Sequence, residues 1–85
     1  MAAATRTYRV LLEWDAEGAA WCVSVPALPG CFTFGDTREE ALRQAEEAIE
    51  CHLLGLRADG EPLPEDDDGE IVLERVSVSL PAERR

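Results

Sequence analysis

Residues 25–40, VPALPGCFTFGDTREE, constrain the fold more than any other part of the sequence. Pro26 and Pro29 fix two φ angles and lack backbone N–H donors, so a preceding strand must end there. Gly30 then permits a backbone conformation that a side chain would hinder. The segment predicts a stiff elbow between two strands.

After the elbow, the sequence predicts a short strand and the start of a helix. Residues 31–34, CFTF, alternate small or polar with aromatic side chains, as a strand does. Gly35 and Asp36 are expected to turn the chain. Thr37 is expected to accept a hydrogen bond as the N-cap, and Glu40, three residues on, completes a capping box.

Apolar residues in the rest of the chain follow two periods. Before the elbow they alternate over residues 8–14 and 21–25, which predicts two half-buried strands joined as a hairpin by a turn at 15–18. From Arg38 they recur every three or four residues, which predicts an amphipathic helix of about five turns that ends before Gly60. Its apolar stripe comprises Ala41, Leu42, Ala45, Ala48, Ile49, His52, Leu53 and Leu56.

The segment after the helix predicts an acidic loop at 61–69 and a last strand at 71–80, with Val72, Val76, Val78 and Leu80 on one face. The chain is therefore expected to form one α+β domain, residues 1–85, with flexible ends at 1–6 and 81–85. Its βββαβ order predicts a two-layer fold with a mixed four-stranded sheet, strand order 3-2-1-4, and one helix on one face. The opposite face is expected to form an oligomer interface, a dimer or higher, through Leu11, Cys22, Ile71 and Leu73.

Charge excludes one class of partner. Eighteen acidic residues against eight basic ones, all of them Arg, give a net charge of −10. Such a domain is repelled by phosphate backbones, so we expect no direct contact with nucleic acid. The sequence also contains no apolar run as long as the roughly 20 residues of a membrane span and no hydrophobic signal core, so we expect a cytoplasmic protein without membrane contact.

Neither a metal site nor a catalytic site is expected. Cys22, Cys31 and Cys51 lack the close spacing of zinc ligands, and their odd number without a secretory signal indicates reduced thiols. His52 falls on the apolar helix stripe, where a structural role is expected. The carboxylates lie in turns, in a loop and on separate faces, so they do not predict an acid cluster of the kind that holds catalytic metals. No cofactor is expected, and the sequence leaves the roles of His52 and the cysteines open.

The order of these pieces resembles the HicB family of antitoxin-like proteins over roughly residues 8–64. The resemblance rests on a strand, a turn, a second strand ending in VPALPGC, and GDTREEA at the start of a helix. It implies a truncated RNase H-like fold and a partner, the small basic HicA toxin that cleaves RNA. Many family members continue into a DNA-binding domain, whereas this sequence ends at Arg85, so a stand-alone HicB domain is expected.

Two functions remain open at this point. The first is an antitoxin that neutralises a HicA-like toxin through outward acids, because opposite charge favours association. The second is a HicB-like oligomeric interaction or ligand-binding module without a toxin. The acids expected to face a toxin are Glu39, Glu46, Glu47, Glu50, Asp66, Asp67 and Asp68.

Overall fold

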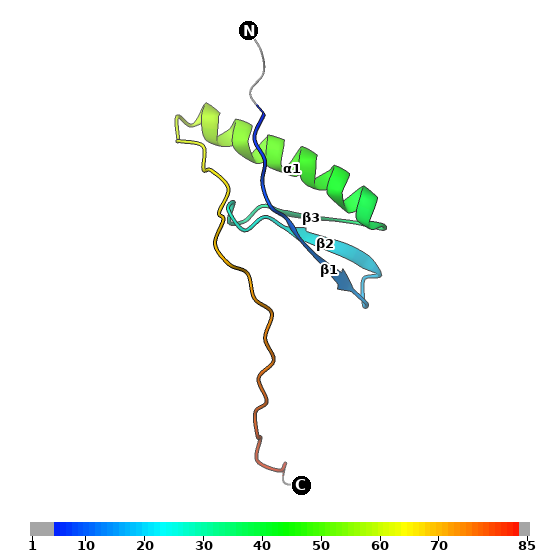
Figure 1. The fold of residues 1–85 in the computed structure, drawn as a ribbon. Helices are drawn as coiled ribbons and strands as arrows, with labels where there is room; N and C mark the ends of the chain where they lie inside the picture. Colours follow the sequence, from blue (N-terminus) through cyan, green and yellow to red (C-terminus); the bar gives the residue numbers. More distant parts are fainter. Residues whose placement is uncertain (1–4, 84–85) are drawn as a thin grey trace.

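Three antiparallel strands precede a single helix in the computed structural model, which describes residues 5–83 (Figure 1). The strands are β1 (Leu11–Asp15), β2 (Ala20–Ser24) and β3 (Phe32–Gly35), in the order β1-β2-β3, and the helix is α1 (Arg38–Ala58). This arrangement confirms the predicted α+β class. Among the residues described, no helix is long and apolar enough to cross a membrane.

Alternation along the strands gives the sheet a buried face and an open face. Leu12 lies opposite Val23, which in turn lies opposite Thr33, and α1 covers this face. The core formed there is small, because its fully buried members on the helix are Ala41 and Ala45. At the hairpin end, the rings of Trp14 and Trp21 pack at 5.5 Å between centroids.

The predicted elbow is present and supplies a second core cluster. The N–H groups of Val25, Leu28 and Cys31 donate to the carbonyls of Cys31, Val25 and Leu28, respectively. Gly30 has a φ of +85°, in the left-handed region that favours glycine. These constraints turn Leu28 inward against Ile49 and Leu53 of α1, where it is almost completely buried.

The first proline of the elbow explains why the first hairpin is shorter than predicted. Beyond Ser24, the next β2 position that faces β1 is Pro26, which has no N–H to donate, and the Arg9 N–H opposite it donates to Asp66 instead. The strand predicted over residues 8–14 therefore begins at Leu11 and ends at Asp15.

The helix begins and ends as the sequence predicts. The Thr37 hydroxyl accepts a 3.0 Å hydrogen bond from the Glu40 N–H, which forms the N-cap half of the predicted capping box. At the other end, Gly60 has a φ of +74°, and the N–H groups of Gly60 and Glu61 donate to the carbonyls of Arg57 and Leu56. This pair of bonds is a Schellman motif, and it satisfies the last carbonyls of α1.

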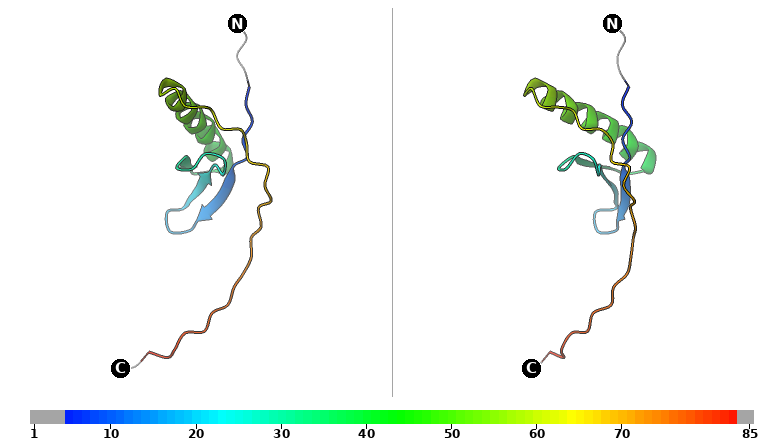
Figure 2. Two further views of the ribbon diagram at one scale, coloured as in Figure 1. Left: turned by 90° about the vertical axis from the view of Figure 1, so that its left-hand side faces the viewer. Right: turned by 60° about the vertical axis from the view of Figure 1, so that its left-hand side comes forward.

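The fourth strand predicted at residues 71–80 is not present. The segment is extended, but it forms no strand pairing within the part of the chain that the structure describes, and it leaves the sheet (Figures 1 and 2). The predicted mixed sheet of order 3-2-1-4 is therefore wrong for this chain by itself, and only its 3-2-1 part is confirmed. The predicted flexible ends, 1–6 and 81–85, lie partly outside the described residues.

Gly35 lets the sheet and the helix meet at close range. A methyl group added at this position would lie 2.5 Å from the backbone nitrogen of Ala41 and 2.8 Å from its Cα, closer than any real contact allows. Gly35→Ala is therefore expected to lower the free energy of unfolding by about 1–3 kcal/mol, the usual cost of overpacking, in urea denaturation.

Gly55→Ala is the matched control, because the same methyl group on the exposed side of α1 meets nothing within 4 Å. Replacing a helical glycine by alanine should raise the stability by up to about 1 kcal/mol. Equal stabilities of the two variants would contradict the close approach of β3 and α1.

Candidate protein-interaction surface

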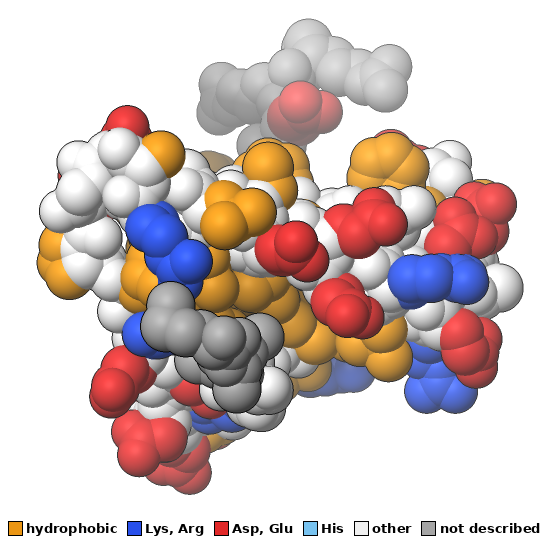
Figure 3. All heavy atoms as spheres, turned by 90° about the horizontal axis from the view of Figure 1, so that it is seen from above, with side chains coloured by type: hydrophobic (Ala, Val, Ile, Leu, Met, Phe, Trp, Pro, Cys, Tyr) orange, Lys and Arg blue, Asp and Glu red, His pale blue; other side chains and the backbone are white. Residues whose placement is uncertain are grey.

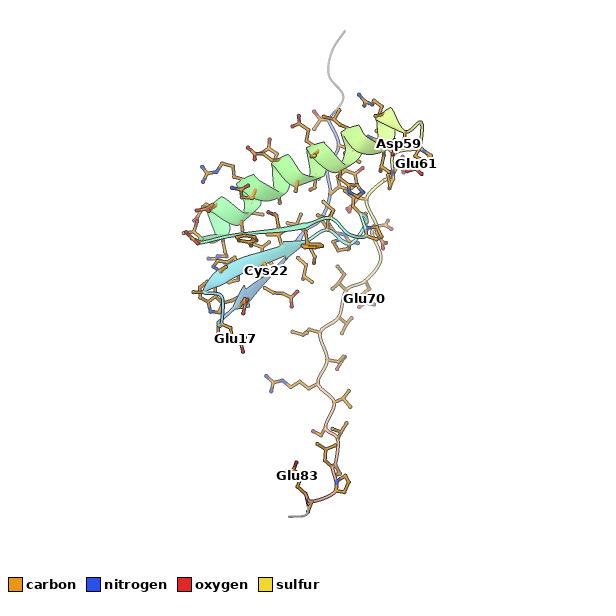
Figure 4. The ribbon with its side chains drawn as sticks, turned by 180° about the vertical axis from the view of Figure 1, so that it is seen from behind. Glu17, Cys22, Asp59, Glu61, Glu70 and Glu83 are labelled. Atoms are coloured by element: carbon orange, nitrogen blue, oxygen red, sulfur yellow. The ribbon has the colours of Figure 1, made fainter. Side chains whose placement is uncertain are left out.

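The face of the sheet that α1 leaves uncovered carries several exposed apolar side chains. They are Leu11 on β1, Cys22 on β2, and Phe32 and Phe34 on β3, and we call these four residues the open face. Glu13 of β1 lies on the same side of the sheet, opposite Cys22. Cys22 lies opposite Phe34 in the β2–β3 ladder, and it is labelled on the sheet in Figure 4. The two phenylalanines are 74% and 67% exposed, which marks the open face as an interaction surface.

Phe32 and Phe34 were not among the interface residues expected from the sequence. The sequence shows that the two phenylalanines alternate with Cys31, Thr33 and Gly35. It does not show whether the phenylalanines or the smaller residues face the helix. The register decides this, because Val23 pairs with Thr33 and therefore puts Thr33 on the covered face. The small size of Cys31 and Gly35 was the available signal, since a helix packs most closely over small residues.

The interface predicted from the sequence is only partly assembled. Leu11 and Cys22 lie on the open face, as expected. Ile71 and Leu73 lie instead on the extended segment 71–80, which we call the arm, and Leu73 is 98% exposed. The structure therefore does not bring these two pairs of residues together within one chain.

The predicted toxin-facing acids on the helix point into solvent. At about 100° per residue, Glu39, Glu46 and Glu50 fall within about 40° of one another on the side away from Ala41 and Ala45, and Glu47 lies next to them. We call these four residues the helix acids. Arg43 lies within their arc and lowers the local charge. Figure 3, which looks down on α1, shows acidic side chains along the helix beside hydrophobic ones.

The loop acids divide into anchored and free residues. Asp66 accepts a 3.0 Å hydrogen bond from the backbone N–H of Arg9, and its carboxylate lies 3.5 Å from the Arg9 Nε. Asp67 lies 3.9 Å from the same guanidinium and accepts from the Gly69 N–H. Asp68 is exposed and makes none of these contacts. Asp66 and Asp67 therefore tie the loop to the segment before β1.

A groove of about 770 Å³ runs between α1 and the segment that leads into β1. Tyr8, Val10 and Leu63 line one side, and Leu42, Ile49 and Leu53 line the helix side, with Glu46, Glu50 and Arg57 at its margin. Leu42 is still 47% exposed there. The groove is therefore an apolar recess beside an acidic helix edge.

The thiols and carboxylates that the structure describes do not assemble a metal site. Within residues 5–83, no three His, Cys, Asp or Glu side chains lie close enough to hold an ion. Cys31 is buried in the elbow cluster, whereas Cys22 and Cys51 are exposed. Burial raises the pKa of the Cys31 thiol, and the nearby Cys51 raises it further, so Cys31 is a protonated packing residue at neutral pH.

Comparison with known proteins assigns this arrangement to a family. The model of the HicB-like antitoxin of bacterial toxin-antitoxin system matches residues 8–81. A UPF0150 protein of Thermoplasma acidophilum is 42% identical over 66 residues, which cover 78% of this chain and 94% of that protein. A UPF0150 protein of Synechocystis is 44% identical over 62 residues, 71% of this chain and 75% of that protein.

An antitoxin is also among the similar proteins. Antitoxin HicB 2 of Photorhabdus laumondii is 48% identical over 42 residues, which cover 49% of this chain and 29% of that antitoxin. No solved structure matches the chain.

The three cysteines provide a test of the elbow and its cluster. Alkylation requires an accessible thiolate, so Cys31 should react with iodoacetamide at least about tenfold more slowly than Cys51 at pH 8, because it is buried and its pKa is raised. Peptide mass spectrometry would give the three rates, with the urea-unfolded chain as the reference in which they converge. Equal rates for Cys31 and Cys51 in the folded protein would mean that the elbow does not bury Leu28 and Cys31 as described.

Proposed function

The chain belongs to the HicB-like antitoxin family, and from this premise we propose that it binds and neutralises a small basic HicA-type toxin that cleaves RNA. The observation that carries the proposal is the set of helix acids on a domain with a net charge of −10. A toxin that binds RNA needs a basic surface. Opposite charges on the two proteins favour association and cover the surface that would otherwise meet phosphate.

The helix acids are better suited to this contact than most of the loop acids. They project from a rigid element, so little conformational entropy is lost when they meet a partner. Asp66 and Asp67 are already engaged by Arg9, whereas Asp68 is exposed and makes neither contact. We propose that Glu39, Glu46, Glu47 and Glu50 form the centre of the toxin contact and that Asp68 adds to the field.

The proposed role is that of a binding protein rather than an enzyme. It requires no cofactor and no direct contact with nucleic acid, and its place is the cytoplasm, where an RNA-cleaving toxin acts.

A second function is supported by the exposed phenylalanines of the open face. Apolar residues of this size on one sheet face fit an oligomeric interaction module, which needs no toxin. The two functions are separable, because the first depends on the helix acids and the second on the opposite side of the sheet.

Charge reversal tests the first function. With a small basic HicA-type toxin as the partner, Glu46→Arg with Glu50→Arg should slow association about tenfold at low salt and reduce its salt dependence, because steering acts on the on-rate. Stopped-flow binding and inhibition of RNA cleavage would measure the effect, and circular dichroism would check that α1 persists.

The matched control is Glu17→Arg with Glu83→Arg, which changes the net charge by the same amount at sites away from the helix (Figure 4). Its association rate should fall much less. If both double variants slow binding equally, only net charge matters, and the helix acids are not the contact. If neither affects binding, the acidity is not the means of recognition.

A further inference from the structure

The arm, residues 71–80, is apolar and has no partner within the described chain. Its sequence, IVLERVSVSL, is rich in β-branched residues, and every residue in it is exposed, with Val76 at 85%. The arm gives the chain a radius of gyration of 17.5 Å, whereas a compact domain of 85 residues has about 12 Å. An exposed, extended apolar segment is suited to pairing with a sheet edge.

The sheet has a free edge that matches the arm. β1 pairs with β2 on one side and with no strand on the other among the described residues. The unpaired backbone groups along Leu11–Asp15 are a template for an additional strand. Leu42 remains half exposed in the groove between α1 and the segment that leads into β1. An added strand would therefore find both backbone partners and apolar contacts.

The loop before the arm directs it away from its own β1. Residues 64–69 are held beside Tyr8 and Arg9: the Tyr8 hydroxyl donates to the Pro64 carbonyl, and the Arg9 guanidinium donates to the Gly69 carbonyl at 2.8 Å. Asp67 accepts from the Gly69 N–H in a local turn, and the chain then leaves the sheet (Figure 2). The arm therefore begins beside the β1 edge of its own chain but does not pair with it.

Composition favours a second copy of this chain as the occupant of the edge. The arm contains one acid, Glu74, and one base, Arg75, so it is neutral in a chain of net charge −10 and does not repel another copy. A basic toxin would be expected to meet acidic side chains instead. Each copy offers one arm and one free edge, so two copies can satisfy each other in a closed two-fold exchange.

We propose that the arm of each chain adds to the free edge of β1 in a second copy, so that two chains exchange their fourth strands. Each sheet then gains the strand order 3-2-1-4 with strand 4 supplied by the partner copy. Val72, Glu74, Val76 and Val78 share the side of the strand that faces α1 and the groove, and Ile71 and Leu73 extend the open face beside Leu11. The proposal does not rest on a toxin, because it uses only the arm and the β1 edge.

A pair of variants in the full chain tests the exchange. The wild-type protein should be a dimer at high micromolar concentration, and Val76→Asp should raise the dimer dissociation constant at least about tenfold, since it puts a carboxylate on the buried side of both exchanged strands. Ser77→Asp is the matched control, because it introduces the same group on the other side of the strand, and it should remain dimeric. Sedimentation equilibrium would give the constants.

Isotope-filtered NMR on a mixture of differently labelled chains distinguishes exchange from a strand folded back in one chain. Nuclear Overhauser effects between Val76 or Val78 methyls of one chain and β1 amides of the other are the expected result. A monomeric wild type, a Val76→Asp dimer as tight as the wild type, or contacts between arm and β1 only within one chain would each overturn the proposal. Because no toxin is present in either experiment, their outcome is independent of the proposed antitoxin function.

Discussion

The close contact between Gly35 and the backbone of Ala41 determines how the sheet and helix fit together. With no side chain at Gly35 and only a methyl group on Ala41 and on Ala45, the first turns of α1 lie directly on β3 and β2. The elbow then turns Leu28 beneath the middle of the helix and fixes its direction. Among the described residues, no strand pairs with the outer edge of β1.

A core built from such small residues buries little apolar surface. Its buried members are Val23, Val25, Leu28, Cys31, Ala41 and Ala45, whereas both phenylalanines and the apolar residues of the arm are exposed. A domain of this size is marginal when it folds alone, so burial of these groups against another chain would contribute much of its stability. The helix acids suit a basic partner, and the open face and the arm suit a like chain, with Glu46 and Glu50 at the margin of the groove between α1 and the segment before β1.

The elbow and both ends of the helix were predicted correctly from residues close together in the sequence. The prolines and glycine of the elbow, the Thr37 cap and Gly60 each act through backbone geometry within a few residues, and each is found where the sequence placed it. The fourth strand was not predictable in the same way, because its pairing depends on contacts between Arg9 and residues 66–69 far along the chain. The faces of Phe32 and Phe34 and the engagement of Asp66 were missed for the same reason, since register and ion pairing are properties of the folded chain.

In the exchange that we propose, a second copy supplies the strand that the sheet of one chain lacks. Amide hydrogen exchange of residues 71–80, measured over a range of protein concentrations, tests this most directly. Strand pairing with a partner predicts slow exchange in the arm at high concentration and loss of that protection on dilution, while the amides of α1 stay protected. The exchange of strands would be contradicted if the arm amides exchange at the rate of an unfolded peptide at every concentration. It would also be contradicted if their protection does not change on dilution.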